Sequence, residues 1–386
     1  MLNLKLIGIG AAGNKGAIQV LNDGVLKKED VLLINSVEKD IPAEYRDGAF
    51  IYNAIGGCGK EASMGKALAL KALADDKLAD VIDNLITEDT DAVIIVSSAE
   101  GGTGCGGAPI IAKFCNDTIG IPTICIPFTG FEEDARGLQN TIEYFQNMND
   151  EYVVQAISNK KFLKNSNYNK AAEDANKELS NRIKMMQGRD LKDSLQNIDR
   201  TDLYKSVTTP GFTMMNKVSL SDVKTAEQFN DALLALIDTE KSVDIDTNNS
   251  KIQVLAVMIN IDKSKEDIID QSFTVLKERL GEPYEIFRHI QYDDTQEEYV
   301  SFMAQGLGMP TKEIKKVYER YLEKTSHVDK NKDSFFDQIK ELKGDEEDNQ
   351  FNIGSMRRRK KRVSTDDFLN QYRKKDDNDD IISKNY

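Results

Sequence analysis

The chain has 386 residues, of which 40% are hydrophobic and 30% charged, and its formal net charge is −14. This length suits two domains with an appended segment, and the acidic balance argues against broad nucleic-acid binding by the body of the protein. Two histidines and four cysteines without CxxC spacing argue against a His-dependent triad, a zinc hydrolase and a zinc ribbon. No apolar run approaches the roughly 20 residues of a membrane-spanning helix, so we expect a soluble, cytoplasmic protein without a membrane partner.

Short β-branched runs alternate with helical stretches in the first third of the chain, which is the pattern of a parallel sheet covered by helices. The expected strands are 2–9, 31–34, 91–97, 121–128 and 152–157. The expected helices are one from about residue 14, one over 63–86 and one over 108–115. The prediction is an α/β fold whose first domain is Rossmann-like.

A single helical stripe follows this sheet. Its apolar residues are spaced four, four, four and three positions apart: Ala171, Ala175, Leu179, Ile183 and Met186. We expect a long connector helix here, ended before Pro210-Gly211. The remaining elements are predicted as helices at 225–238, at 265–280 and from 310, with strands at 252–261, 284–292 and 298–304.

These patterns divide the chain into five expected segments. They are a nucleotide-binding domain (1–168), a connector-helix region (169–209), a smaller α+β domain (210–308), a C-terminal helix (309–344) and a flexible, disordered charged tail (345–386). The tail carries a basic run made of Arg357, Arg358, Arg359, Lys360, Lys361 and Arg362. Such a run fits binding to an acidic protein surface or to DNA phosphate, and a solvated tail is the plainer alternative.

The first glycine-rich turn reads GIGAAG from Gly8 to Gly13 and fits GxGxxG between a strand and a helix. Glycines let the backbone approach phosphate, and the helix N-terminus presents free N–H groups. A dinucleotide-binding domain expects an acid at the end of the second strand, where this chain has Asn35-Ser36-Val37. The nicotinamide interpretation is weakened accordingly.

Two more glycine-rich turns follow. Residues 100–109 (EGGTGCGGAP) place five glycines in seven residues between a buried strand and a helix, which is a second phosphate-binding nest. Residues 56–60 (GGCGK) are not a P-loop, because GxxxxGK[ST] needs glycine at Ala54 and a hydroxyl at Glu61. Three such turns predict a nucleotide with a polyphosphate, with ordinary tight turns as the plainer alternative.

The motifs, in this order, resemble those of the tubulin/FtsZ superfamily over residues 3–305. GGTGCG resembles the phosphate motif GGGTG[TS]G, and GIGAAGN looks like the first loop of the family. Pro127-Phe128-Thr129 with Glu132 and Arg136 resembles PFxFEGxxR, and ISNK from Ile157 resembles IPND. Thr209–Phe212 and then Ser221-Asp222-Val223 resemble the loop whose acid assists hydrolysis.

The resemblance implies a GTP-binding first domain that takes GTP or GDP, an activation role for the second domain, and Mg²⁺ held through the triphosphate rather than by a protein cluster. It implies phosphate contacts from Gly10, Ala11, Ala12, Gly13, Gly57, Cys58, Gly59, Gly101, Gly102, Thr103, Gly104, Cys105 and Gly106. It places Asn14, Asn159 and Asn176 near guanine or sugar, and Glu132 and Arg136 near the ribose. The plainer alternatives are a solvated helix face for Asn176 and an i,i+4 ion pair for Glu132 and Arg136.

The resemblance also implies a GTPase activated by polymerisation, in which the loop after the connector helix of one subunit supplies acids to the nucleotide of the next. Asp222 is the catalytic candidate, and a helix N-cap is its plainer role. Three departures from the family pattern are Glu100 for its first glycine, Val37 for an acid and Ser219 for a further acid. They leave two alternatives open: slower hydrolysis, or compensation by another residue.

The charged tail resembles that of TubZ, the branch that segregates plasmid and phage DNA, and the GCGKE run is similar to clostridial versions. This resemblance implies head-to-tail self-assembly and a DNA-binding adaptor of TubR type held by the basic run at 357–362. An FtsZ-like cell-division GTPase, an NAD-dependent oxidoreductase and a non-hydrolysing structural homologue stay open.

Overall fold

The computed structural model describes residues 1–131, 133–148, 152–192, 197–244 and 252–326. The described strands form one sheet in the order β10-β9-β11-β8-β6-β5-β4-β1-β2-β3, with β7 beside β5. The strands are β1 (Leu4–Ile9), β2 (Val31–Asn35), β3 (Phe50–Ile51), β4 (Ala92–Ser98), β5 (Thr123–Thr129), β6 (Val153–Val154), β7 (Ile157–Ser158), β8 (Gly211–Ser219), β9 (Val254–Asn260), β10 (Glu285–Gln291) and β11 (Tyr299–Leu307). The helices are α1 (Gly10–Asn22), α2 (Ala62–Ala74), α3 (Lys77–Leu85), α4 (Gly102–Lys113), α5 (Ala135–Asn147), α6 (Tyr168–Gln187), α7 (Arg200–Thr208), α8 (Ala226–Asp238), α9 (Thr274–Leu280) and α10 (Thr311–Thr325).

The first part of the sheet is parallel and buried on both faces. β1 pairs with β2 and β4, and β4 pairs with β5, all in parallel register. Their continuous apolar runs suit strands that are covered on both sides. Across the whole sheet, side chains from α1, α6 and α7 pack on one face and those from α2–α5, α8 and α9 on the other, with α7 and α8 on the strands of the second part. The predicted α/β class is confirmed.

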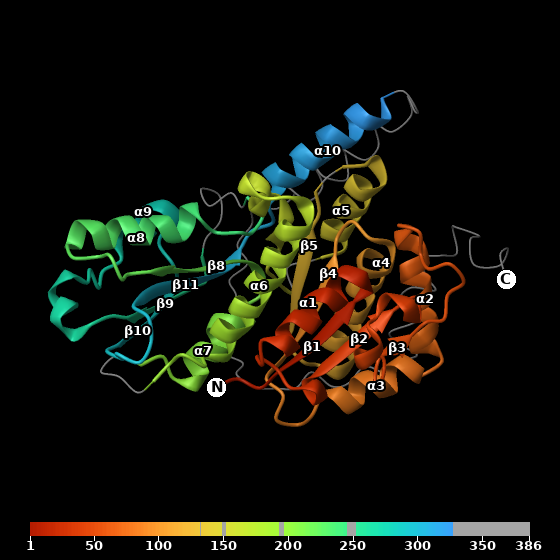
Figure 1. Cartoon of the computed structure of the whole chain (residues 1–386), viewed down its shortest axis with the longest axis horizontal. Helices are drawn as coiled ribbons and strands as arrows, with labels where there is room; N and C mark the ends of the chain where they lie inside the picture. Colours follow the sequence, from red (N-terminus) through yellow and green to blue (C-terminus); the bar gives the residue numbers. More distant parts are fainter. Residues whose placement is uncertain (132, 149–151, 193–196, 245–251, 327–386) are drawn as a thin grey trace.

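The second part is a mixed sheet, in which β11 runs antiparallel to β8 and β9 while β9 and β10 are parallel. It joins the first part through β6 and β8, where Val153 pairs with Gly211 and Val154 with Phe212. One sheet therefore continues through the expected boundary near residue 210. In Figure 1, α6 crosses the middle of the molecule between the two parts, from the end near α5 and α10 to the end near α7.

The connector helix α6 follows the predicted stripe, whose five apolar residues are all fully buried. The Asn167 side chain caps its first turn, and Gly188 ends it in the left-handed conformation. The Leu2 amide donates to the Gln187 carbonyl at 3.1 Å, so α6 ends beside the start of β1.

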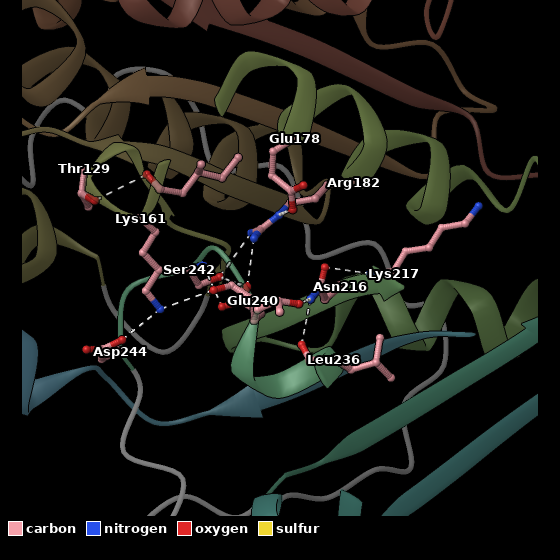
Figure 2. A network of polar contacts seen from close by, with 12 residues as sticks. Thr129, Lys161, Glu178, Arg182, Asn216, Lys217, Leu236, Glu240, Ser242 and Asp244 are labelled. Carbon is pink, nitrogen blue, oxygen red and sulfur yellow. Dashed lines mark hydrogen bonds and ion pairs between the residues drawn. The ribbon is translucent and has the colours of Figure 1, made fainter. Parts of the chain in front are cut away.

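A buried polar network fixes α6 to the second part of the molecule. Arg182, 1% exposed, donates to Glu178 and Glu240 at 2.9 Å each and to the Ser242 hydroxyl at 3.2 Å. Figure 2 shows Arg182 reaching from α6 into the turn that carries Glu240 and Ser242. Nearby, Lys161 pairs with Asp244 at 2.9 Å. The turn after α8 is thus held by both α6 and the segment that precedes α6.

Several elements differ from the prediction. The single helix expected over 63–86 is two helices, because Asp76 adopts φ +58° between α2 and α3. The expected helix over 265–280 is a 3₁₀ turn (Lys263–Ile268) followed by α9. Helix α7 and strand β8 were not predicted. The expected C-terminal helix is seen as α10, and residues 327–344, with the tail at 345–386 and its basic run, lie outside the described residues.

Candidate functional site

The three glycine-rich turns follow β1, β3 and β4, and all three of these strands belong to the parallel part of the sheet. Carboxyl ends of parallel strands share one edge, where open α/β sheets bind ligands. The turns also contact one another. An ideal Cβ on Gly10 would lie 3.1 Å from the Gly104 nitrogen, and one on Gly102 would lie 2.8 Å from the Cys58 Cβ. The Thr103 hydroxyl donates to the Ser36 hydroxyl at 3.0 Å, which adds the end of β2 to the same cluster.

Two helices begin within these turns, earlier than the sequence predicts. Helix α1 starts at Gly10, whose φ of +74° suits glycine, and α4 starts at Gly102. The preceding residues, Ile9 and Gly101, give neither helix a side-chain cap. The first-turn N–H groups of both helices are therefore available to an anion, which the helix dipole also favours.

Two buried asparagines leave polar atoms without a hydrogen-bond partner among the described residues. The Asn14 Nδ2 donates to the Ile34 carbonyl at 3.1 Å, but its Oδ1 has no partner. The Asn35 Oδ1 accepts from the Ser36 amide at 2.8 Å, but its Nδ2 has none. Buried polar groups are normally satisfied, so these two atoms fit the polar groups of a bound nucleotide.

Two ion pairs join the third turn to the start of α5. Lys60 pairs with Asp134, which caps α5, and Arg136 pairs with Glu61 at 3.0 Å. Arg136 therefore lies at the predicted edge, while its predicted neighbour Glu132 is outside the described residues. Burial raises the pKa of the carboxyl of Glu100, the residue before Gly101, although the Lys60 ammonium opposes this.

Asn140 links two of the turns and was not found from the sequence. Its side chain is buried, and its Nδ2 donates to the Lys60 and Glu100 carbonyls at 2.9 Å each. The Cys105 thiol donates to the Asn140 carbonyl at 3.2 Å. The site therefore depends on a side chain from α5 that is 80 positions from Lys60 and 40 positions from Glu100 in the sequence.

Some predicted ligands lie at the edge of this cluster or away from it. Cys105 faces α5, and Gly106 packs on α2, where an added Cβ would be 1.8 Å from the Ala62 carbonyl oxygen. Asn159 follows β7 at the carboxyl edge, and Asn176 is half-buried on α6. Neither asparagine side chain makes a hydrogen bond to another described residue.

Asp222 is not in the loop that follows the connector helix. It is exposed in the turn between β8 and α8, and the cap of α8 is Thr225 rather than Asp222. The loop after α6 runs instead from Gly188 to Asp199, where α7 begins. The placement of Asp222 predicted from the sequence is therefore wrong, because the acids nearest the end of α6 come more than twenty residues earlier.

The loop after α6 lies at the opposite edge of the sheet from the glycine-rich turns. The Arg200 guanidinium pairs with Asp91, directly before β4, at 2.6 Å, and Arg189 donates to the Gly24 carbonyl at 3.0 Å. Asp199 caps α7 by accepting from the Asp202 amide at 2.8 Å. Partial burial, together with the Asp199 carboxylate, raises the pKa of Asp202.

Within the described part of the chain, no three His, Cys, Asp or Glu side chains gather in a group able to hold a metal ion. Among the same residues, no helix is long and apolar enough to cross a membrane. A cavity of about 460 Å³ lies at the other end of α1, beside Leu21 and Lys28, and does not include the glycine-rich turns.

Comparison with known proteins gives relatives of one kind. No family model matches the chain. The cell division protein FtsZ of Aquifex aeolicus is 25% identical over 224 residues, 55% of this chain and 58% of that protein. FtsZ of Mycoplasmopsis pulmonis is 31% identical over 167 residues, 42% of this chain and 40% of that protein. The chain thus matches about half the length of these relatives.

Solved structures cover more of the chain. CetZ1 of Haloferax volcanii, a GDP-bound monomer, has a TM-score of 0.66 at 18% identity and covers 83% of this chain and 99% of its own. TubZ of Clostridium botulinum phage c-st has a TM-score of 0.64 at 16% identity and covers 85% of this chain and 100% of its own. TubZ of Bacillus thuringiensis, in a GTPγS-form protofilament, has a TM-score of 0.68 at 16% identity and covers 88% of this chain and 94% of its own. The chain has the fold shared by FtsZ, CetZ and TubZ, and the comparisons support its place in the tubulin/FtsZ superfamily without separating these branches.

Proposed function

We propose that the protein binds GTP at the carboxyl edge of its sheet, assembles head to tail into filaments, and hydrolyses GTP in the assembled state. One observation carries this proposal: the glycine-rich turns and the loop after α6 lie at opposite edges of the same parallel sheet. Stacking copies in one orientation brings the loop of one copy onto the turns of the next. A site built in this way is complete only between two copies, so hydrolysis follows assembly.

The phosphates are bound by the first-turn N–H groups of α1 and α4, with the Thr103 hydroxyl beside them. The first turn of α1 includes Ala11, Ala12 and Gly13, and the remaining proposed phosphate contacts are Gly57, Cys58, Gly59 and Gly101. The amides of Asn14, Asn159 and Asn176 are proposed to contact the guanine or sugar, because an amide can both donate and accept. Mg²⁺ bound through the triphosphate and water would offset the charge on the phosphates.

Asp199 and Asp202 are the proposed acids for hydrolysis. Both lie where the loop after α6 meets α7, at the amino edge of the sheet. Their carboxylates can orient a water molecule and accept its proton, and the raised pKa of Asp202 brings it closer to that of an effective general base. They replace Asp222, whose assignment depended on a different position for the loop.

The solved relatives support a guanine nucleotide and a filament. One is a GDP-bound CetZ1 monomer, and another is a GTPγS-form TubZ protofilament. Both share the fold of this chain at 18% identity or less. They support the proposal by analogy of fold, and the site residues named above supply its chemistry.

Light scattering with GTP, GDP and a slowly hydrolysed analogue tests assembly, and phosphate release tests turnover. Asp199→Asn keeps the cap of α7 while removing the charge, so we expect normal assembly with turnover lowered about 10²-fold or more. The parallel variant Asp222→Ala separates the two assignments. Loss of turnover in Asp222→Ala but not in Asp199→Asn or Asp202→Asn would restore the sequence-based candidate.

We further propose that these filaments segregate plasmid or phage DNA in the cytoplasm, with the basic run at 357–362 engaging a TubR-type adaptor. The charged tail supports this role. The two FtsZ relatives are cell division proteins, which favours an FtsZ-like role as the second candidate. Deleting residues 327–386 should abolish recruitment to adaptor-bound DNA and spare GTP binding. Binding to a membrane anchor with ring formation would favour division instead.

A further inference from the structure

Strand β10 carries two buried polar side chains that the proposed function does not use. His289 and Gln291 are two residues apart and therefore point to the same face of the sheet, and each is only 2% exposed. Phe287, on the same face, packs with the core that includes α6 and α7, whereas Ile290 packs in the core on the opposite face. The two polar residues therefore face the region where α6 ends and α7 begins.

Their hydrogen bonds go to the backbone of the loop after α6. The Gln291 Nε2 donates to the Asp190 carbonyl at 2.9 Å, and its Oε1 accepts from the Lys192 amide at 2.9 Å. The His289 Nδ1 accepts from the Ile198 amide at 3.4 Å. The pair thus holds the loop near both of its ends, after α6 and before α7.

A contact between the two side chains fixes the histidine tautomer. The His289 Nε2 lies 2.8 Å from the Gln291 Oε1, which can only accept. Nε2 must therefore carry the proton, which leaves Nδ1 free to accept from Ile198. Burial lowers the pKa of His289, in keeping with a neutral ring.

We propose that His289 and Gln291 are positioning residues that set the place of the proposed hydrolytic acids, Asp199 and Asp202, where the loop after α6 meets α7. The inference rests on the proposed function, because it concerns the same loop. Ile198 directly precedes Asp199, whose carboxylate caps α7 through the Asp202 amide. A shift of the Ile198 amide therefore moves both acids, and a misplacement of about 1 Å can cost 10²-fold in rate.

The bonds of this pair connect the loop to the second part of the molecule. Within β10, His289 is held in register with Met258 of β9, so its position follows that part of the sheet. Buried polar groups are costly unless they are hydrogen-bonded. Two apolar side chains could fill the same space but could not hydrogen-bond to the loop backbone. His289 and Gln291 make those bonds.

The test compares the full chain with His289→Leu, Gln291→Met and His289→Asn. We expect unchanged GTP affinity and unchanged assembly with the slowly hydrolysed analogue in all three. Turnover in filaments should fall at least about tenfold in His289→Leu and Gln291→Met. His289→Asn should keep most of the turnover, because its Oδ1 takes the place of the ring Nδ1 and can accept from the Ile198 amide. The control Ile290→Val, on the opposite face of β10, should lower the melting temperature and leave turnover unchanged.

Amide hydrogen exchange gives a readout that does not depend on GTP. The Lys192 and Ile198 amides should be protected in the wild type and exchange faster in Gln291→Met and His289→Leu. Wild-type turnover in folded His289→Leu and Gln291→Met, or unprotected amides in the wild type, would overturn the inference. If His289→Leu does not fold, the turnover of Gln291→Met and the amide exchange of the wild type decide whether the inference holds. A wild type that binds no GTP would refute the proposed function instead, and exchange would still judge the loop contacts.

Discussion

Glu100 places a carboxylate directly before the glycine-rich turn that starts α4. Its Oε2 occupies the space that a Cβ on Gly130 would need, at 1.7 Å, so it is turned toward the β5–α5 loop. Burial raises its pKa above the ordinary value of 4.5. A raised pKa favours the neutral carboxyl, which would repel a phosphate of the proposed nucleotide less than a carboxylate does.

Glu100→Gln should raise the free energy of unfolding near neutral pH and change it little near about pH 4. A carboxyl whose pKa is raised on folding gives up protons on unfolding, so its contribution to stability is lost as the pH rises from 4.5 through the raised value. Glutamine does not titrate and escapes this loss. Urea unfolding of both proteins at the two pH values measures the effect, and equal differences at both would contradict it.

Asn140→Ala should lower the free energy of unfolding by about 1–3 kcal/mol, because it leaves the Lys60 and Glu100 carbonyls without their donor. It should also weaken GTP binding, since these carbonyls belong to two of the turns. The matched control is Asn147→Ala on the same helix, whose exposed amide donates to the Glu143 carbonyl. It should stay within about 0.5 kcal/mol of the wild type, and equal losses in both variants would refute the assignment.

The site residues proposed from the sequence are those that a local sequence pattern marks. Glycines between a strand and a helix form a visible pattern, and Asn14 directly follows one such glycine-rich turn. Asn140 and Ser36 are not marked in this way, since their partners are distant in the chain and only folding brings them together. Asp199 did leave a signal: Gly188 ends the stripe of α6, and the Asp199-Arg200-Thr201-Asp202 run is a helix start with a capping aspartate.

At the scale of elements, helices α1 and α4 were predicted to start too late. Glycine has a low helix propensity, so glycine-rich runs favour loops in a sequence-based prediction. In α4, close packing on α2 overrides that propensity, because an added Cβ on Gly106 would meet the Ala62 carbonyl oxygen at 1.8 Å. The parallel pairing of β1, β2, β4 and β5 follows from alternating buried strands and helices and could be predicted, whereas the strand order was not predicted.

Gly106→Ala and Gly107→Ala form a matched pair on α4. Gly106→Ala should destabilise the protein by about 1–3 kcal/mol or more, through overpacking against α2. Gly107→Ala meets its nearest atom at 3.6 Å, an ordinary contact, and should stabilise by up to about 1 kcal/mol through helix propensity. Thermal unfolding measures both, and the same sign of change in the two variants would contradict this packing.

At the scale of the whole molecule, the junction between α6 and the second part depends on Arg182. Arg182→Ala should cost about 3–5 kcal/mol, since it leaves the Glu240 carboxylate buried at 2% exposure without its partner. Lys170→Ala, which breaks an exposed ion pair with Asp174 on the same helix, should cost at most about 0.5 kcal/mol. Urea unfolding compares them, and similar small losses would mean that the network in Figure 2 does not stabilise the junction.

The polarity of the molecule follows from where its loops lie. The turns after β1, β3 and β4 lie at one edge of the sheet, and Asp199 lies at the other, next to Asp91 through Arg200. This arrangement could not be predicted from the sequence, because the loop after α6 has no apolar period and its acids resemble ordinary surface residues. Under the proposed function, the opposition of the two edges makes the filament, rather than the single chain, the active unit.

The proposed function is tested most directly by the rate of GTP hydrolysis per subunit, measured as the protein concentration is raised through the onset of light scattering. We expect almost no hydrolysis below that onset and, above it, a rate proportional to the concentration of polymerised protein. A constant rate per subunit at all concentrations, or hydrolysis by chains held monomeric, would show that one copy contains the whole site and would contradict it.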